Sequence, residues 1–300
     1  MSCGVCGAPV TVPYLSGARD YQFGVDFLAE IKGCSICGLL QQSPMPTREQ
    51  ALAFYPKNYT HYNFTPSRLR SLLIGIYFRP LTKLLLGMGA NPSQTLLDIG
   101  CGPGEKAAFL RDRLGLQVVG LEPNELAAKR ARDIFGVETI NDFFPSKKIG
   151  PQSFDFVYFN HVIEHVPDPV ALLNSSYETL KPGGWLIGET ENITSLSSRV
   201  FGRYWSLCHM PFHLYFFSPD TLRRTFAASM FGPPTLETLW DPSVVVISLQ
   251  NILRRHKAPG EIRSAQVPGY FAWLLLTSPL AVIEQFNGPI IRFWVQKPNL

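Results

Sequence analysis

The feature that most constrains the fold is a glycine-rich turn between a buried strand and a helix. Residues 95–99 have the short apolar pattern of a buried strand, and residues 105–114 have the pattern of a helix. The turn reads D-x-G-x-G-x-G and is formed by Asp98, Gly100, Gly102 and Gly104. Because glycine lacks a Cβ, such a turn can bend sharply and bring its backbone close to a ligand. The free N–H groups at the start of the helix then favour an anionic group.

Strand and helix patterns alternate from residue 91 onward. The sequence predicts strands over residues 95–99, 117–121, 137–140, 154–159, 185–189, 235–240 and 290–296. It predicts helices over residues 105–114, 124–135, 168–180 and 219–230. This alternation indicates a parallel sheet with helices on both faces, so we predict a doubly wound, Rossmann-like α/β fold. The last strand could pair antiparallel at the sheet edge, a point that the sequence leaves open.

An acidic residue, Glu122, ends the second predicted strand. At this place in the unit a carboxylate can accept hydrogen bonds from both hydroxyls of a ribose. A dinucleotide-binding turn would read G-x-G-x-x-G, but Glu105 stands where the third glycine would be. An acid facing a pyrophosphate is unfavourable, so the turn favours a nucleoside ligand without phosphates. The alternative is a glycine-rich turn that binds no ligand.

Four motifs occur in order along this region: LDIGCGPG at 97–104, GLEPN at 120–124, FDFVYFNHVIEHVP at 154–167 and LKPGG at 180–184. In these motifs the chain resembles class I S-adenosylmethionine (SAM)-dependent methyltransferases. It most resembles the broad bacterial group that includes the ubiquinone-pathway O-methyltransferases and surface-glycan methyltransferases. The resemblance covers residues 95–192 and implies a seven-stranded sheet and SAM as the methyl donor.

The resemblance also implies roles for individual residues around SAM. Asp98, Gly100, Gly102 and Gly104 would form the loop around its methionine moiety. Glu122 would hold the ribose, and Asp142 would contact the adenine amino group. Asn160, just past the fourth strand, would face the sulfonium and the acceptor; its alternative role is a strand-end hydrogen bond.

Methyl transfer from a sulfonium is an in-line displacement that depends on holding the two reacting atoms together. A hydroxyl or an acidic carbon also calls for a base with a pKa near neutrality, and histidine is the first choice. His213 lies in a W…P-x-H-x-x-x-F-S segment that resembles the family's segment over the acceptor pocket; alternatively, it only pins this loop. His161 follows the fourth strand. Glu191 stands where the family often has Pro-Asn, and it could act as a base, bind the acceptor or face solvent.

Two Cys-x-x-Cys-Gly turns near the N-terminus indicate a metal site. Cys3, Cys6, Cys34 and Cys37 can present four thiolates to one tetrahedral Zn²⁺. Four thiolates leave no position for water, so the zinc would be structural. The turns resemble the zinc ribbon in front of sugar C-methyltransferases, which have a further C-terminal domain that this chain lacks. A redox pair and unliganded thiols are the alternatives.

The sequence thus predicts a zinc ribbon over residues 1–45, a helical lid or linker over 46–90 and a methyltransferase domain over 91–300. Residues 68–86 and 270–283 are strongly apolar, and the first of them is also basic. They could lie on a membrane or admit a lipid chain. The interpretation that we favour is that they cover the sheet and the SAM site.

The charge pattern bears on partners. The net charge is +4, from 27 Lys and Arg against 23 Asp and Glu, and it is spread thinly, which argues against nucleic acid. No signal-peptide pattern is present, so we expect a cytoplasmic protein, with peripheral contact at the inner membrane face left open. We expect methyl transfer to an oxygen, or less so a carbon, of a small-molecule, sugar or lipid-linked glycan acceptor. The alternatives are a zinc-ribbon RNA methyltransferase and a non-catalytic SAM-binding or interaction protein.

Overall fold

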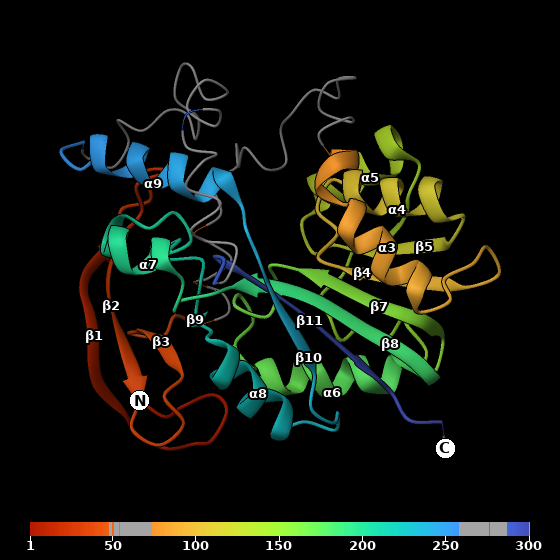
Figure 1. Cartoon of the computed structure of the whole chain (residues 1–300), viewed down its shortest axis with the longest axis horizontal. Coiled ribbons are helices and arrows are strands. Elements are labelled where there is room, and N and C mark those ends of the chain that lie inside the picture. Colours follow the sequence, from red (N-terminus) through yellow and green to blue (C-terminus); the bar gives the residue numbers. More distant parts are fainter. Residues whose placement is uncertain (48–49, 51–53, 55–73, 258–275, 277–286, 300) are drawn as a thin grey trace.

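The computed structural model describes residues 1–47, 50, 54, 74–257, 276 and 287–299. A seven-stranded sheet with helices on both faces lies beside a four-stranded sheet that contains the N-terminal residues (Figure 1). This confirms the predicted doubly wound α/β fold with a small module in front. Among these residues, no helix has both the length and the apolar character needed to cross a membrane.

The seven strands follow the order β10-β11-β8-β7-β4-β5-β6. The parallel strands are β4 (Thr95–Ile99), β5 (Gln117–Leu121), β6 (Glu138–Ile140), β7 (Phe154–Asn160) and β8 (Leu180–Glu191). The antiparallel strands are β11 (Ile290–Gln296) and β10 (Thr235–Leu239). The winding reverses between β4 and β7, and in such sheets ligands bind at the carboxyl ends of the strands at this point.

Two details of the sheet differ from the sequence expectations. The last strand, β11, does pair antiparallel with β8, but it is not the edge strand, because β10 pairs along its other side. The Pro182-Gly183-Gly184 segment, which precedes the strand predicted from residue 185, lies inside β8. A register shift between β7 and β8 at Phe154 and Phe156 accommodates it.

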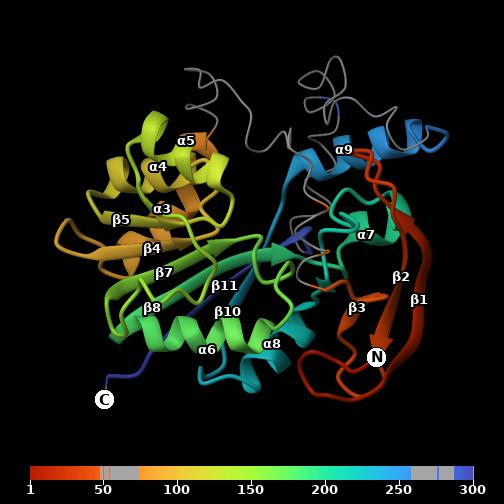
Figure 2. The same cartoon turned by 180° about the vertical axis from the view of Figure 1, so that it is seen from behind.

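The alternation of side chains along the strands fills two apolar cores. On β4, Leu97 joins the core under α6 (Pro169–Thr179) and α8 (Pro219–Ala227), whereas Leu96 joins the core under α3 (Arg79–Gly87) and α4 (Glu105–Leu114). α5 (Glu125–Phe135) lies on the same face as α4 (Figure 2). Period-two burial of this kind is expected of a sheet covered on both faces.

Polar side chains cap the start of two of these helices. The Asn124 side chain accepts a hydrogen bond of 3.0 Å from the Ala127 N–H at the start of α5. The Asp168 side chain accepts one of 2.8 Å from the Ala171 N–H at the start of α6. Each cap pairs an N–H group that the first turn of a helix leaves free.

The four-stranded sheet combines strands from two regions that are far apart in the sequence. It contains β1 (Val10–Arg19), β2 (Leu28–Cys34), β3 (Leu40–Ser43) and β9 (Tyr215–Phe216), all antiparallel. β9 comes from the segment that carries His213, so the N-terminal sheet includes a strand of the methyltransferase region. α7 (Leu196–Phe201) and α9 (Pro242–Leu253) lie on the same side of the molecule as this sheet (Figures 1 and 2).

Part of the apolar segment 68–86 is described, and it packs on the protein. Leu81 and Leu85 of α3 are buried in the core beside α4, in agreement with a covering role for this stretch. Residues 68–73 and most of the segment 270–283 lie outside the described residues.

Candidate active site

The carboxyl ends of four neighbouring strands carry polar side chains. Asp98 lies near the end of β4, Glu122 directly follows β5, Asn160 ends β7 and Glu189 lies near the end of β8. β4 lies between β5 and β7 in the sheet, so these residues share one edge at the switch point. The first three were predicted from the sequence to contact SAM; Glu189 was not singled out.

The glycine turn after β4 has a backbone that only glycine adopts readily. Gly100, Gly102 and Gly104 have φ values of 70°, 56° and 85°, all in the left-handed region. Two of the three also lack room for a side chain. A Cβ on Gly100 would lie 2.7 Å from Cγ2 of Val162, and one on Gly104 would lie 2.7 Å from Cβ of Ala131. The turn is therefore in contact with the loop that follows β7.

Glu122 supports this turn from the neighbouring strand. Its Oε2 accepts a hydrogen bond of 2.9 Å from the Gly102 N–H, and its Oε1 accepts one of 2.8 Å from the Asn124 N–H. Burial raises the pKa of Glu122 to about 7, against the effect of these two hydrogen bonds. A carboxylate has about four acceptor positions. Glu122 can therefore hold the turn and still accept hydrogen bonds from two hydroxyl groups.

Asp98 is 2% exposed, and its Oδ2 accepts no hydrogen bond from any group that the structure describes. Burial raises the pKa of Asp98 to about 7. An unpaired buried acceptor is costly and is common at binding sites. The carboxyl group is therefore suited to a donor that comes from a ligand.

Asp142 is placed at the same edge, after β6. The Asn141 side chain donates a hydrogen bond of 2.8 Å to the Glu122 carbonyl oxygen, which fixes this loop beside β5. The Asp142 carboxylate accepts from the Phe143 N–H at 2.8 Å and from the Ser146 hydroxyl at 2.7 Å. Its side chain is 36% exposed, so it remains accessible to a ligand.

A network of charged side chains that the sequence analysis missed surrounds Asn160. The Asn160 amide donates a hydrogen bond of 2.5 Å to Oε2 of Glu189 and accepts one from Nζ of Lys106. Arg292 of β11 pairs with Oε1 of Glu189 at 2.6 Å and with Glu237 of β10 at 3.0 Å. Arg292 lies opposite Glu189 in the pairing of β11 with β8. No sequence signal gave this pairing, because it depends on which strand lies beside β8.

His161 forms a short hydrogen bond with a buried glutamate. Its Nδ1 lies 2.7 Å from Oε1 of Glu164, and its side chain is 27% exposed whereas that of Glu164 is fully buried. Burial acts to raise the pKa of Glu164, but the charge and hydrogen bond of His161 keep it below its ordinary value. His161 has a φ of 53°, a conformation that is strained for a residue with a side chain. The backbone thus holds an imidazole at the strand end against an ionised carboxylate.

Glu191 is fully buried, so the expectation that it could face solvent is wrong. Burial, and then the charge of Glu164, raise its pKa well above the ordinary value. The Thr190 hydroxyl lies 3.0 Å from Glu164 and 2.9 Å from Glu191. Because this hydroxyl has only one proton, it donates to the ionised Glu164 and accepts from the protonated Glu191. A protonated Glu191 is a hydrogen-bond donor and not a base.

His213 lies deeper than His161. Its side chain is 3% exposed, and its Nδ1 is 3.9 Å from Oε2 of Glu191. Burial, and then the nearby His165 and His209, lower its pKa well below the ordinary value. His165 contacts the His213 ring at a centroid distance of 4.5 Å and the Phe212 carbonyl oxygen at 2.8 Å through Nδ1. Of the two predicted histidines, only His161 has appreciable exposure.

The side chains near these histidines are spaced closely enough to hold a cation. Ligand atoms of His161, Glu164 and Glu191 lie within 4.8 Å of one another, as do those of Glu164, His165 and His213. Within the first group, the structure itself contains a hydrogen bond between Nδ1 of His161 and Oε1 of Glu164. The geometry itself therefore supports a hydrogen-bonded acid–base group.

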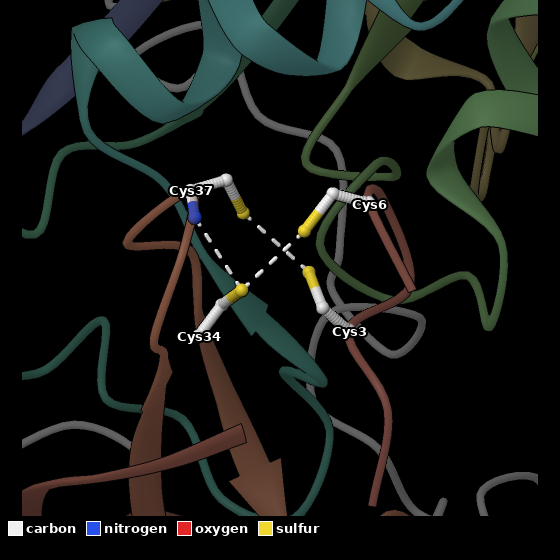
Figure 3. Close-up of side chains that lie close together, drawn as sticks. All are labelled: Cys3, Cys6, Cys34 and Cys37. Carbon is white, nitrogen blue, oxygen red and sulfur yellow. Dashed lines mark hydrogen bonds between the residues drawn. The ribbon is translucent and has the colours of Figure 1, made fainter. Parts of the chain in front are cut away.

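The side chains of the four predicted metal ligands point toward one another (Figure 3). Their sulfur atoms lie within 4.8 Å of one another, with Cys3 and Cys37 at 3.5 Å and Cys6 and Cys34 at 3.4 Å. All four are free thiols in the structure. Backbone N–H groups of Ile36 and Cys37 lie 3.5 and 3.4 Å from Sγ of Cys34, as they do in a metal knuckle.

The chain matches a known family and several known proteins. The sequence profile of the family described as "Methyltransferase domain" matches residues 71–231. The ubiquinone biosynthesis O-methyltransferase of Xanthomonas campestris pv. campestris (strain B100) is 34% identical over 114 residues, which are 35% of this chain and 46% of that protein. The protein of the same name from Cereibacter sphaeroides (strain ATCC 17029) is 33% identical over 138 residues, 42% of this chain and 56% of that protein.

A solved structure shows the same fold. Phosphoethanolamine N-methyltransferase 2 of Haemonchus contortus, in complex with SAM, superposes with a TM-score of 0.53 at 21% identity and covers 86% of this chain and 63% of that one. The chain spans about half the length of the curated relatives that it matches. The family profile, by contrast, covers more than half of the 300 residues and includes the glycine turn, Glu122 and His161. The chain therefore belongs to the class I SAM-dependent methyltransferases.

Proposed function

We propose that this protein is an O-methyltransferase that transfers the methyl group of SAM to a hydroxyl of a small-molecule, sugar or lipid-linked glycan acceptor. The observation that carries the proposal is the hydrogen-bonded pair of His161 and Glu164 directly beside the glycine turn. Val162, the residue after His161, is the side chain that a Cβ on Gly100 would strike. A base and the cofactor loop are therefore adjacent.

The described residues fit SAM. Gly100 and Gly104 leave no room for a side chain, and the buried Asp98 has an unpaired oxygen. Glu122 would accept hydrogen bonds from the ribose, Asp142 would contact the adenine, and Asn160 would lie near the methionine moiety. When bound, SAM supplies an electrophilic methyl group on its sulfonium.

His161 would act as the general base. We assign the proton of its ring to Nδ1, because the ionised Glu164 accepts a hydrogen bond there. The lone pair of Nε2 is then available to take the proton of the acceptor hydroxyl. Glu164 fixes this tautomer and would stabilise the imidazolium that forms, as the carboxylate does in other His–carboxylate pairs. The donor and acceptor oxygen would otherwise react by in-line displacement, without a covalent enzyme intermediate.

The roles of His213 and Glu191 follow from their burial. His213 is neutral and enclosed, so we propose that it shapes the floor under the acceptor. The protonated Glu191 would keep Glu164 in place through Thr190. Neither side chain reaches the exposed edge in the way that His161 does.

Two observations support an oxygen atom as the methyl acceptor. The (Asn/Asp/Ser)-Pro-Pro-(Tyr/Phe) motif of enzymes that methylate planar amino nitrogens is absent, since Asn160 is followed by His-Val-Ile. The curated relatives are named as O-methyltransferases. An acidic carbon is the second acceptor that the same base could serve.

We also propose that Cys3, Cys6, Cys34 and Cys37 bind one structural Zn²⁺. In a tetrahedral site with Zn–S bonds of about 2.3 Å, neighbouring sulfurs are about 3.8 Å apart. The observed pairs at 3.4 and 3.5 Å are close to this spacing. A zinc here would fix the start of β3 and, through it, β9.

The test is a transfer assay with methyl-labelled SAM. The purified protein is incubated with a cell extract, and the label is partitioned between organic and aqueous phases. Label released by base treatment as methanol, from either phase, would identify an ester, whereas label stable to base and nuclease would identify an ether or a C-methyl product. The His161→Ala variant serves as the control for catalysis by this site.

The two alternatives give different results in the same assay. Label that nuclease releases into small fragments would favour an RNA methyltransferase and overturn the small-acceptor proposal. SAM binding without any transfer, over extracts of several kinds, would favour a non-catalytic SAM-binding protein. A lipid-linked acceptor would place the label in the organic phase.

A further inference from the structure

The side chain of Tyr215, on β9, lies between the N-terminal ribbon and the loop that follows β7. It is 2% exposed and belongs to the same apolar core as Cys3 and Cys37. Its hydroxyl donates a hydrogen bond of 2.8 Å to the carbonyl oxygen of Pro167, at the far end of that loop. The proposed chemistry does not use this buried hydroxyl group.

On one side, Tyr215 and the residue before it hold the loop that carries His161. The backbone N–H groups of Leu214 and Tyr215 both donate to the Glu164 carbonyl oxygen, at 2.8 and 3.2 Å. The side chain of Glu164 is the group whose Oε1 lies 2.7 Å from Nδ1 of His161. Tyr215 thus binds this loop at two points, through its N–H group at Glu164 and through its hydroxyl group at Pro167.

On the other side, Tyr215 contacts the ribbon, where it lies opposite Gln41 in the pairing of β9 with β3. Gly4 stands between Cys3 and Cys6 in the first Cys-x-x-Cys turn. A Cβ on Gly4 would overlap Oη of Tyr215 and lie 2.8 Å from its Cζ. Only a residue without a side chain allows so close an approach. The backbone of this turn therefore encloses the tyrosine hydroxyl group.

We propose that Tyr215 is a positioning residue for methyl transfer: held by the ribbon, it fixes the loop that keeps Glu164 against His161. This role rests on the proposed function of His161 as the general base. A base acts only while its nitrogen lies within hydrogen-bond reach of the hydroxyl that it deprotonates. Because a misplacement of about 1 Å can cost about 100-fold in rate, a firmly held loop favours catalysis. The ribbon would thus contribute to the rate through Tyr215.

A competing explanation is that Tyr215 only fills the core between the two sheets. Loss of its hydroxyl would then lower the stability of the protein, and any change in rate would be the same whether or not His161 is present. A positioning role instead requires that the two residues act as one unit, so their effects on the rate should not multiply. The dependence on His161 therefore separates the two explanations.

The experiment is a double-mutant cycle of Tyr215→Phe and His161→Ala. Transfer from methyl-labelled SAM to a cell extract is measured at an extract concentration beyond which the rate no longer rises. Each rate is divided by the number of S-adenosylhomocysteine sites found by calorimetry, so that unfolded protein is not counted. Tyr177→Phe, which removes a hydroxyl from a half-buried tyrosine of α6, is the matched control.

We expect Tyr215→Phe alone to slow transfer about tenfold, the scale of one hydrogen bond. The SAM concentration at half-maximal rate should not change, because the contacts of Glu122 are untouched. In the His161→Ala background, Tyr215→Phe should slow transfer by less than about twofold, since the base that it positions is absent. Tyr177→Phe should change neither quantity. An equal loss in both backgrounds, or no loss in either, would overturn the proposal.

A second cycle tests the contact with the ribbon. Gly4→Ala should displace the tyrosine hydroxyl and slow transfer. This effect should be smaller in the Tyr215→Phe background, because the atom nearest to the added Cβ is gone. Gly232→Ala, at an exposed glycine where an added Cβ would meet no described atom within 4 Å, is the control. An equal effect of Gly4→Ala in both backgrounds would contradict the route through Tyr215.

Hydrogen exchange separates this inference from the proposed function, because it needs neither an acceptor nor turnover. The His165 N–H donates to the Val162 carbonyl oxygen at 2.9 Å within the loop, and its exchange should be about tenfold faster in Tyr215→Phe. Unchanged exchange would overturn the positioning role. If exchange is faster but His161→Ala does not slow transfer, the proposed base is wrong and the positioning role falls with it. If His161→Ala slows transfer and Tyr215→Phe does not, only the role of Tyr215 is rejected.

Discussion

Two groups of residues lie at neighbouring strand ends but are built in different ways. We call Asp98, the glycine turn and Glu122 the cofactor edge, and we call His161, Glu164, Glu191 and His213 the histidine group. The cofactor edge comes from short, local segments: a turn of three glycines and the single acid Glu122 at the end of the next strand. The histidine group combines the loop after β7, the end of β8 and the segment before β9. The first can form within one βαβ unit, whereas the second also includes His213, whose segment pairs with the N-terminal sheet.

The ribbon touches the histidine group through a few backbone contacts. The Gln42 N–H of β3 donates to the Leu214 carbonyl oxygen at 2.9 Å, and the Gln42 side-chain amide lies 3.2 Å from the carbonyl oxygens of Pro211 and His213. Cys3 and Cys37 lie in the same apolar core as Leu214 and Phe217. Unfolding of the ribbon should therefore displace His213 but not Glu122.

Loss of Cys34, one of the four proposed zinc ligands, should have the largest effect. Structural zinc in small domains contributes on the order of 10 kcal/mol to folding, so Cys34→Ser should unfold the ribbon and release β9. Metal analysis should give about one zinc per chain for the wild type and none for the variant. Hydrogen exchange should show lost protection in β3 and β9, with β4 and β5 unchanged.

Cys208→Ala, at a buried cysteine outside the cluster, is the control and should retain the zinc. A metal-free wild type that is fully folded would refute the zinc ribbon. Equal loss of protection at the glycine turn would break the comparison, because it would show that the two regions are not separable.

His161→Ala should remove the base and leave the cofactor edge intact. General base catalysis contributes typically 10²–10⁴-fold, so transfer should fall by about this factor. Calorimetry should give the same affinity for S-adenosylhomocysteine as the wild type, because the Glu122 contacts are untouched. His256→Ala, at an exposed histidine, is the matched control. Unchanged transfer in His161→Ala would reject His161 as the base.

Glu122→Ala should weaken ligand binding and leave the proposed base His161 in place. The loss of charge-assisted hydrogen bonds to the ribose should weaken S-adenosylhomocysteine binding by roughly 100-fold. The Gly102 N–H also loses its partner, so some loss of stability is expected as well. Glu125→Ala, at an exposed acid on α5, is the control. An unchanged calorimetric affinity would contradict the ribose assignment.

A change of pH should produce the smallest effect on ligand affinity, and this effect should come from two buried carboxyl groups. Burial raises the pKa of Glu122 and Asp98 to about 7, and the ionised forms are the ones that would accept hydrogen bonds from the ribose and from the methionine moiety. Affinity should therefore be highest above pH 7 and fall as the pH drops through 7. For 5′-methylthioadenosine, which has no ammonium, the loss from pH 8 to pH 6 should be about tenfold.

S-adenosylhomocysteine should lose more than this over the same range, because Asp98 also becomes protonated. Titrations of both ligands by calorimetry in buffers of matched ionisation enthalpy would measure the difference. A flat profile for both would show that neither carboxylate titrates in this range.

The same raised pKa has a consequence for stability. A carboxyl whose pKa is higher in the folded than in the unfolded state stabilises the fold most below its unfolded pKa, and this stability is lost as the pH rises through the folded value. The ligand-free protein should therefore lose thermal stability between about pH 4.5 and pH 7, while ligand affinity increases. This opposition is expected where a buried acid is kept for binding.

The residues of the cofactor edge could be identified from the sequence by itself. Asp98, the three glycines and Glu122 follow strands whose apolar patterns are continuous, and strand and helix periods need no distant contact to be recognised. The parallel strands could be predicted for the same reason. The four cysteines were also evident, because two equal turns can offer a tetrahedral site wherever they meet.

Only the tertiary structure decided the rest. Glu189 pairs with Arg292 because β11 lies beside β8, and Glu191 is buried against the segments on both sides of β9. The protonation of Glu191 and the relative exposure of His161 and His213 depend on neighbours far away in sequence. Burial and charge are properties of the surroundings in space, and local sequence patterns do not contain them.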